Sequence, residues 1–241
     1  MTSCNNCHRR EPDVKLLTCR SCFSAQYCSK ECQRSDWPKH RGPCRSINPV
    51  PPIPNASQSS WASWLQGLLG EEINGAYGPS PPKGLDSAIS EPFTRLQNGT
   101  FLHDRSERDV YRILIDSFRF RLEEQCQHEG KPAKGTIYED HDDSLPDFKR
   151  YLETAASRNN LLPPWWTPEK QRECEAFGMS GTNFQDLHMA LEQFSVTCQY
   201  GDSRFPSQLR MLAEAVYGKG VGGTSSFTRR SALAQLEAER R

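Results

Sequence analysis

The sequence lacks any long apolar run. No stretch of its 241 residues approaches the roughly 18 consecutive apolar side chains that a membrane-crossing helix needs. Hydrophobic residues make up only 35% of the chain, mean hydropathy is −0.75, and glycine and proline together number 33. This composition predicts a protein without a membrane segment, in which two ordered parts are joined by a loose one.

Cysteine is scarce outside the N-terminal segment. Seven of the ten cysteines fall within the first 44 residues, and only Cys126, Cys174 and Cys198 lie beyond them. A secreted disulfide scaffold would not concentrate its cysteines in this way. The first cysteine of the cluster is Cys4, which leaves no room before it for a cleavable signal or transit peptide. We therefore expect a reducing compartment, the cytoplasm or the nucleus.

The N-terminal cysteines are paired at the spacing of metal ligands. Two Cys-x2-Cys pairs are followed by one Cys-x3-Cys and one His-x3-Cys, and such spacings bring two donor atoms onto one ion. Eight ligands make two tetrahedral zinc sites, and a closed four-ligand site supports structure and not catalysis. The predicted zinc ligands are Cys4, Cys7, Cys19, Cys22, Cys28, Cys32, His40 and Cys44.

Charge gives no argument for a nucleic-acid partner. The chain has 30 basic and 30 acidic residues, although residues 1–45 carry nine Lys or Arg against four Asp or Glu. Four thiolates on one Zn²⁺ leave a charge of −2, and three thiolates with a neutral histidine leave −1. The zinc-loaded segment is then near +2, so nucleic acid is an unfavoured partner.

These residues resemble the MYND zinc finger. The resemblance covers residues 4–44 and includes the two Cys-x2-Cys pairs, an aromatic before the Cys-x3-Cys as in Tyr27-Cys28, and the final His-x3-Cys. It implies a small, irregular cross-brace fold with two zinc ions that binds a protein partner. MYND fingers are known for grooves that take proline-containing peptides, so such a peptide is an expected ligand.

The resemblance also implies how the ligands are shared. In the family the pairs interleave, which gives a first site of Cys4, Cys7, Cys28 and Cys32, and a second site that takes the remaining four ligands, Cys19, Cys22, His40 and Cys44. Spacing alone does not choose this arrangement. A sequential assignment, with the first four ligands on one ion and the last four on the other, satisfies the valence of zinc equally well.

Composition divides the rest of the chain. We expect the finger over residues 1–45, and then a linker rich in Pro, Ser and Gly over 46–92 with a short amphipathic helix near 60–70. A mainly α-helical domain follows over 93–218, and a Gly/Ser hinge with a charged tail occupies 219–241. The predicted fold is thus a two-zinc finger, a linker and a helical domain.

The helical domain shows periodic apolar stripes. The clearest follows Ser106, which has Asp109 three residues later as in a capped helix, and it ends before Gly130. Further helices are predicted from Ser144 and from Thr167, the latter ending just before Gly178. Two more stripes are Phe184, Leu187, Leu191 and Phe194, and then Leu209, Leu212, Ala213 and Val216.

A second resemblance lies in this domain. The proline-aromatic stretch over 161–173, which reads Leu-Leu-Pro-Pro-Trp-Trp-Thr-Pro-Glu at its start, and the later segments 200–202 and 208–214 are similar to the helical tail of fungal MYND proteins, including relatives of a mitochondrial splicing suppressor. This similarity implies regulatory work on gene expression.

We therefore expect a non-enzymatic adaptor or regulator. MYND fingers also accompany SET-domain lysine methyltransferases, but the Asn-His-Ser/Cys cofactor motif of those enzymes has no counterpart, because no Asn is followed by His anywhere in the chain. A mainly helical remainder is also the wrong architecture for a SET fold. A sequence-specific DNA-binding regulator is a further alternative, disfavoured by the near-neutral finger.

Overall fold

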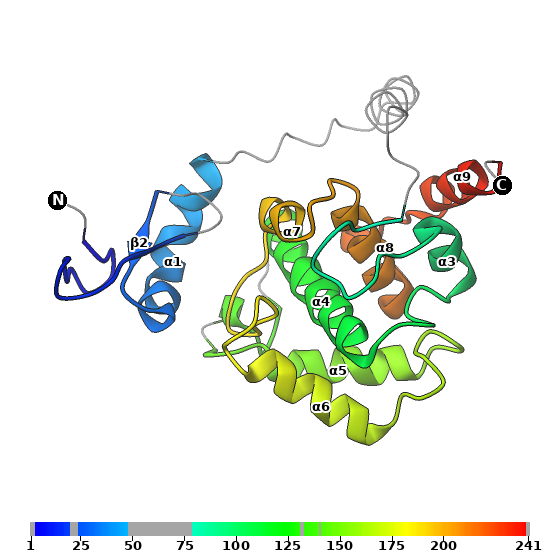
Figure 1. Cartoon of the computed structure of the whole chain (residues 1–241), viewed down its shortest axis with the longest axis horizontal. Helices are drawn as coiled ribbons and strands as arrows, with labels where there is room; N and C mark the ends of the chain where they lie inside the picture. The colour runs from blue at the N-terminus through cyan, green and yellow to red at the C-terminus, as the bar shows by residue number, and fades with distance from the viewer. Residues whose placement is uncertain (1–2, 20–23, 48–78, 131–132, 140, 240–241) are drawn as a thin grey trace. The chain divides into compact units, whose positions relative to one another are not determined.

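The computed structural model describes residues 3–19, 24–47, 79–130, 133–139 and 141–239. The chain forms two compact units, Met1–Ala76 and Tyr77–Arg241. The predicted proline-rich stretch and the helix near 60–70 lie outside the described residues. The first unit is the cysteine-rich segment, and the second is built from helices, as predicted (Figure 1).

Within its described residues, the first unit has a two-stranded sheet and one helix. The antiparallel strands β1 (Leu17–Thr18) and β2 (Gln26–Tyr27) pair with Leu17 opposite Tyr27, and α1 (Lys30–Ile47) follows directly. The buried hydrophobic residues of its described part are Cys4, Cys19, Ala25 and Tyr27, and two of these four are predicted zinc ligands. So little apolar burial gives this unit scant stability of its own.

The second unit contains seven α-helices within its described residues. They are α3 (Pro92–Asn98), α4 (Glu107–Glu129), α5 (Leu145–Ala156), α6 (Pro168–Met179), α7 (Gln193–Tyr200), α8 (Phe205–Tyr217) and α9 (Phe227–Ala238). Two short 3-10 turns, η1 (Ile137–Glu139) and η2 (Val221–Gly223), complete the set. No described helix has both the length and the apolar character needed to cross a membrane.

Helix α4 is the central element of this unit. It is buried from Asp109 to Glu124 with the exception of Arg112, and it packs on α5, α6 and α8 (Figure 1). The predicted N-cap is confirmed, because the Ser106 hydroxyl accepts a hydrogen bond from the Asp109 amide at 3.2 Å. Gly130 ends the helix in the left-handed conformation, with φ of 63°, that glycine adopts at low cost.

The helix starts predicted at Ser144 and Thr167 are confirmed in position. Thr167 caps α6 through its hydroxyl, whereas the Ser144 hydroxyl makes no cap and accepts instead from the Ile137 amide. The predicted end of α6 is wrong by two residues, since the helix runs to Met179 and Gly178 lies inside its last turn. A Cβ at Gly178 would stand 2.9 Å from Leu187, so this glycine permits close packing.

The stripe from Phe184 to Phe194 is not a helix. Residues 180–192 are irregular, and α7 begins only at Gln193. The Arg119 guanidinium of α4 donates to the main-chain carbonyls of Phe184, Met189 and Ala190, at 3.0 to 3.3 Å, and so holds this segment without helical bonds. Two residues of the stripe nevertheless contribute to the hydrophobic core, because Leu187 and Leu191 are buried.

Residues 79–92 pack as part of the second unit, although the sequence suggests linker up to residue 92. Ser80 and Ile89 pair across a short loop and are both buried. The Ser80 hydroxyl donates to the Asp202 carboxylate at 2.5 Å and accepts from the Gln208 amide at 2.7 Å. This loop is therefore fixed on the helices by a buried polar network.

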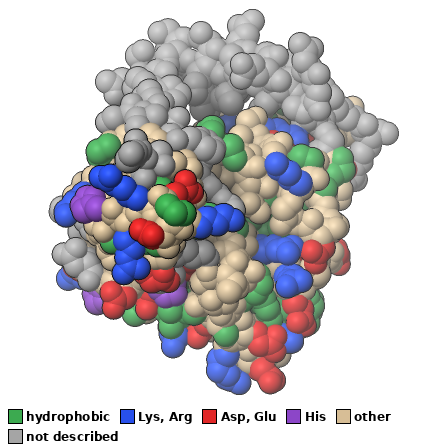
Figure 2. All heavy atoms as spheres, turned by 60° about the vertical axis from the view of Figure 1, so that its left-hand side comes forward, with side chains coloured by type: hydrophobic (Ala, Val, Ile, Leu, Met, Phe, Trp, Pro, Cys, Tyr) green, Lys and Arg blue, Asp and Glu red, His purple; other side chains and the backbone are tan. Residues whose placement is uncertain are grey.

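The surface carries mixed charge. On the face drawn in Figure 2, basic, acidic and apolar side chains are interspersed among the described residues, with no continuous patch of one colour. The formal charge of the whole chain is +0. Neither observation supplies the one-sided basic surface that a nucleic-acid-binding protein uses.

Candidate metal centre

The first cysteine pair lies on a tight loop that is tied to strand β2. The Cys4 amide donates to the Arg9 carbonyl and the His8 amide donates to the Cys4 carbonyl, both at 2.9 Å, so the chain turns back on itself around the pair. Asn5 and Gln26 exchange hydrogen bonds, since the Asn5 amide donates to the Gln26 carbonyl and the Asn5 side chain accepts from the Gln26 amide. This pairing holds Cys4 and Cys7 beside the end of β2.

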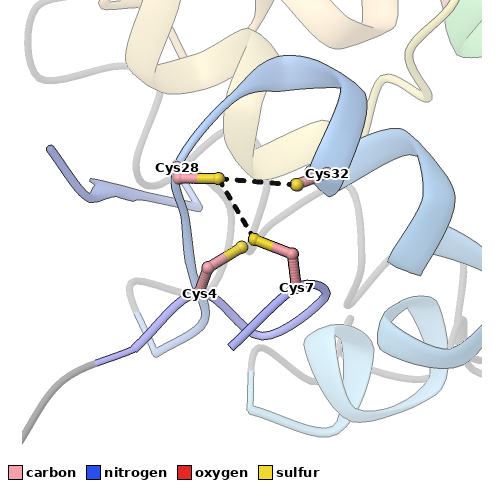
Figure 3. A group of neighbouring side chains, drawn as sticks. All are labelled: Cys4, Cys7, Cys28 and Cys32. Atoms are coloured by element: carbon pink, nitrogen blue, oxygen red, sulfur yellow. Dashed lines mark hydrogen bonds between the residues drawn. The ribbon is translucent and has the colours of Figure 1, made fainter. Parts of the chain in front are cut away.

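The second pair lies where β2 passes into α1. Cys28 directly follows the strand, and Cys32 is in the first turn of the helix. The Ser29 hydroxyl accepts from the Cys32 amide at 3.2 Å, which caps the start of α1. One sulfur thus comes from the turn before α1 and the other from its first turn, and both point toward the loop that carries Cys4 and Cys7 (Figure 3).

The four sulfurs converge on one point. All four Sγ atoms of Cys4, Cys7, Cys28 and Cys32 lie within 4.8 Å of one another, with Cys7 to Cys28 at 3.4 Å and Cys28 to Cys32 at 3.5 Å (Figure 3). Tetrahedral zinc with Zn–S bonds of about 2.3 Å separates its sulfurs by about 3.8 Å. The residues fit a structural zinc ion, and a four-sulfur set leaves no position for a reacting water.

Local hydrogen bonds prepare one of these sulfurs to be a thiolate. Burial raises the pKa of the Cys4 thiol, but backbone amides of Cys7, Cys28 and Asn6 donate to its sulfur and bring the pKa down to about 6. The pKa of Cys28 moves the other way, to about 12, because its hydrogen bonds to Cys7 and Cys32 favour the neutral thiol. Four thiolates this close repel one another, so a divalent cation is the natural partner of the set.

The structure describes half of the second predicted ligand set. Cys19 and His40 are both buried, at 2% and 6% exposure. Cys22 and the side chain of Cys44 lie outside the described residues, so this set, and with it the interleaved assignment as a whole, stays a prediction. The four sulfurs that cluster are those expected for the first site of the interleaved assignment, and they differ from the first site of the sequential one.

Aromatic packing surrounds His40. The ring of Tyr27 lies 5.8 Å from the His40 ring and that of Trp37 lies 6.1 Å from it, both edge-on. The Tyr27 hydroxyl donates to the Asp36 carboxylate at 2.8 Å, which fixes the strand to α1. Trp37 thus packs against the small hydrophobic core of the finger.

The three cysteines beyond the finger differ in accessibility. Cys174 on α6 is fully buried, and burial raises the pKa of its thiol well above the ordinary value, whereas Cys198 on α7 is exposed. Because the thiolate is the reactive form, we expect a thiol reagent to label Cys198 first and Cys174 only after unfolding. Mass spectrometry of the alkylated peptides, before and after urea, measures this order. Early labelling of Cys174 would contradict the buried position of its side chain.

Comparison with known proteins agrees with this geometry. The MYND finger family matches residues 4–44. The chain is 40% identical over 45 residues to the "SET domain and MYND-type zinc finger protein 6" of Schizosaccharomyces pombe, a match that covers 19% of this chain and 9% of the relative. No solved structure matches the chain. Residues 4–44 are therefore a MYND-type zinc finger, a zinc-binding module for protein–protein interaction.

Proposed function

We propose that this protein is a non-enzymatic adaptor or regulator that recruits a protein partner through its zinc finger. The observation that carries the proposal is the four-sulfur cluster of Cys4, Cys7, Cys28 and Cys32. A zinc ion held there is closed by four protein ligands, so it organises a surface and activates no water. The cytoplasm or the nucleus, which keep thiols reduced, are the compartments in which such a site is stable.

The finger holds two zinc ions in this proposal. Cys19, Cys22, His40 and Cys44 form the second site, and the burial of Cys19 and His40 supports this assignment. Zinc-loaded protein should then release two equivalents of metal to a chelator. A Cys19→Ser variant should retain the first site and lose the second.

A proline-containing peptide is the ligand we propose for the finger. Beside His40, the finger has a shallow hollow of about 250 Å³ whose walls come from α1 and from the loops around β2. Its edge includes Pro43, Ala25 and the charged side chains of Asp36 and Lys39. A surface of mixed apolar and polar character suits an extended peptide better than a polyanion such as nucleic acid.

The absence of enzymatic activity is part of the proposal. The relative from Schizosaccharomyces pombe has a SET domain in its name, but the similarity is confined to the finger. The described remainder of this chain is helical and has no extended sheet, and its sequence has no Asn-His pair. Transfer of label from S-adenosylmethionine to protein substrates by the zinc-loaded chain would overturn this part.

Control of gene expression is the process we assign to the adaptor. Support comes from the resemblance of residues 161–173 and 200–214 to the helical tail of fungal MYND proteins. Within the second unit, Trp166 of the first segment lies edge-on to Tyr111 of α4 at 6.2 Å, and the ring centroids of Tyr200 and Phe205 in the second segment lie 4.3 Å apart. They therefore work as packing residues of one folded domain.

Affinity capture tests the proposed function. The intact zinc-loaded protein and a Cys19→Ser variant serve as baits in parallel, and bound proteins are identified by mass spectrometry. We expect partners of the finger to be at least about tenfold depleted with the variant, because loss of one ligand opens the second site and the docking surface depends on it. Partners that bind both baits equally belong to the helical unit.

Cys198→Ser is the matched control for this experiment. Cys198 is exposed on α7 and belongs to no cysteine cluster among the described residues, so its substitution should leave all partners bound. Capture of the same proteins in the same amounts by all three baits would contradict the finger as a docking module.

A further inference from the structure

The hollow beside His40 follows one face of helix α1. Four of its lining residues belong to α1 and stand at positions 36, 39, 40 and 43, and the others are Asn5, Ser24 and Ala25. Spacings of three and four residues place side chains on one helix face. At a rise of about 1.5 Å per residue this face extends about 10 Å along the helix, the length of about three extended residues. The hollow therefore has room for a short extended segment of a ligand.

The two charged side chains of this face are engaged differently. The Tyr27 hydroxyl donates to the Asp36 carboxylate at 2.8 Å, and Asp36 is half-buried. Lys39 is exposed, and it takes part in no hydrogen bond or ion pair among the described residues. The Lys39 ammonium is therefore the charged group of the hollow that no other described side chain engages.

The charge around Lys39 is positive. Helix α1 has five Lys or Arg against two Asp or Glu, whereas the whole chain has a formal charge of +0. With both predicted zinc sites filled, residues 1–45 stay near +2. A positive surface favours encounter with an acidic segment and disfavours a basic one. The electrostatics of the finger thus favour a partner segment with negative charge.

We propose that the peptide bound in this hollow has an acidic residue beside its proline, and that an ion pair with Lys39 selects it. The inference rests on the proposed function, because it specifies the proline-containing ligand of the finger. Ala25 and Pro43 supply the apolar part of the lining, and the proline ring packs there. The carboxylate of the neighbouring residue then reaches the Lys39 ammonium.

This ion pair contributes more to selectivity than to affinity. Lys39 is exposed, and an ion pair at an exposed site adds little to binding because water and salt screen both charges. A basic residue at the same place in the ligand is repelled. We therefore expect a preference of about fivefold for an acidic over a basic peptide.

Peptide titrations of the intact zinc-loaded chain test this selectivity. The probes are three synthetic peptides that share the core Pro-Ala-Pro and have Glu, Gln or Lys on both sides of it. Charges on both sides make the result independent of the direction in which the peptide binds. Amide NMR signals of Ala25 and Lys39 report binding at the hollow and give the dissociation constants. The wild-type chain should bind the Glu peptide most tightly and the Lys peptide least tightly.

Reversing the charge at position 39 should invert this order. In Lys39→Glu we expect the preference for the Glu peptide over the Lys peptide to fall by about tenfold. The side chain is exposed, so the zinc content and the spectrum of the finger should stay those of the wild type. Partial unfolding cannot produce an inverted order, because it would weaken the binding of all three peptides alike.

Lys15→Glu is the matched control. Lys15 is an exposed lysine of the finger that does not line the hollow, and its substitution changes the net charge by the same amount. Salt screens a charge outside the hollow more than one in contact with the ligand. This variant should therefore keep the wild-type order of the three peptides. An equal loss of selectivity in both variants would show that net charge and not Lys39 selects the peptide, which overturns the proposal.

The remaining outcomes separate this inference from the proposed function. Equal dissociation constants for the three peptides would overturn the inference and leave the proline-containing ligand in place. If Lys39→Glu keeps the wild-type preference for the Glu peptide, another group selects the ligand and the role of Lys39 is wrong. If no peptide shifts the signals of Ala25 and Lys39 in any chain, the ligand proposed for the finger is itself wrong, and the inference falls with it.

Discussion

Replacing Cys28 by alanine should unfold the zinc finger and leave the helical unit folded. Cys28 is the sulfur closest to two others, at 3.4 Å from Cys7 and 3.5 Å from Cys32. Its removal leaves three sulfurs for an ion that structural sites hold with four ligands. We expect zinc to leave the first site and the amide resonances of residues 4–44 to lose their dispersion.

Unfolding of the finger is expected because little besides zinc binding stabilises it. Among the described residues of this unit, only Ala25 and Tyr27 are buried hydrophobic residues that are not predicted ligands. A structural zinc ion contributes on the order of 10–16 kcal/mol to folding in finger peptides, far more than burial of one tyrosine and one alanine. Burial of these side chains therefore cannot keep the finger folded once a zinc ligand is lost.

Zinc stoichiometry and NMR spectra of the intact chain measure the outcome. Cys198→Ala is the control, since Cys198 is an exposed cysteine of the helical unit. The control should keep the zinc content and every finger resonance of the wild type. A Cys28→Ala protein with the full zinc content and a dispersed finger spectrum would show that Cys28 is not a ligand.

The predicted ligands could be recognised from sequence, but their grouping could not be derived from spacing. Two ligands separated by two or three intervening residues can be assigned to one ion, because a knuckle or a helical turn is a local structure. Which pair meets which depends on the bonds between Asn5 and Gln26, which are 21 residues apart. Contacts of this range leave no periodic pattern in the sequence.

In the helical unit too, local features could be predicted from sequence and long-range contacts could not. Helix α4 was predictable because its cap at Ser106 and its apolar spacing are local and agree with each other. The segment from Phe184 to Ala190 has helical spacing as well, but Arg119 of α4 binds its carbonyls and stabilises an irregular path. Helix α3 was missed for a related reason, because the partner of its first amides is Glu237.

Replacing Arg119 by methionine should be the most damaging single change in the helical unit. The guanidinium is 4% exposed and forms an ion pair of 2.8 Å with Asp116, which is fully buried. It also donates to the carbonyls of Phe184, Met189 and Ala190. Methionine matches the volume of the aliphatic stem but removes the cation beside a buried carboxylate, leaving its Oδ1 and three carbonyls without the donor that Arg119 provides.

The expected cost is about 3–5 kcal/mol, the range for removing one partner of a buried ion pair. Urea unfolding of the zinc-loaded chain, followed by helical circular dichroism, measures it. Arg172→Met on the exposed side of α6 is the control and should change stability by less than about 0.5 kcal/mol. A similar small change for Arg119→Met would mean that Asp116 is already neutral in the wild type.

The pH dependence of this variant has a definite sign. Burial raises the pKa of the Asp116 carboxyl above 3.8, while the charge of Arg119 and hydrogen bonds from Tyr200 and Gln185 oppose the rise. Without Arg119 the pKa of Asp116 in the native state rises further. Between 3.8, the pKa of an ordinary Asp in the unfolded chain, and this raised native pKa, the native state binds more protons than the unfolded state. Stability then falls as pH rises through this window, and the variant should lose less stability at about pH 5 than at about pH 8.

A second substitution separates the charge from the packing. Asp116→Asn removes the buried charge, while its side-chain oxygen can still accept from the Tyr200 hydroxyl, which lies 2.6 Å from the carboxylate in the wild type. In the Arg119→Met background, Asp116→Asn should therefore restore part of the lost stability and abolish the pH dependence. The stability that stays lost measures the three carbonyls between Phe184 and Ala190, because their donor is absent in both variants. The double variant could instead be less stable than Arg119→Met. In that case the Asp116 carboxylate of Arg119→Met has another hydrogen-bond donor, and the irregular segment rather than the ion pair determines the stability lost in that variant.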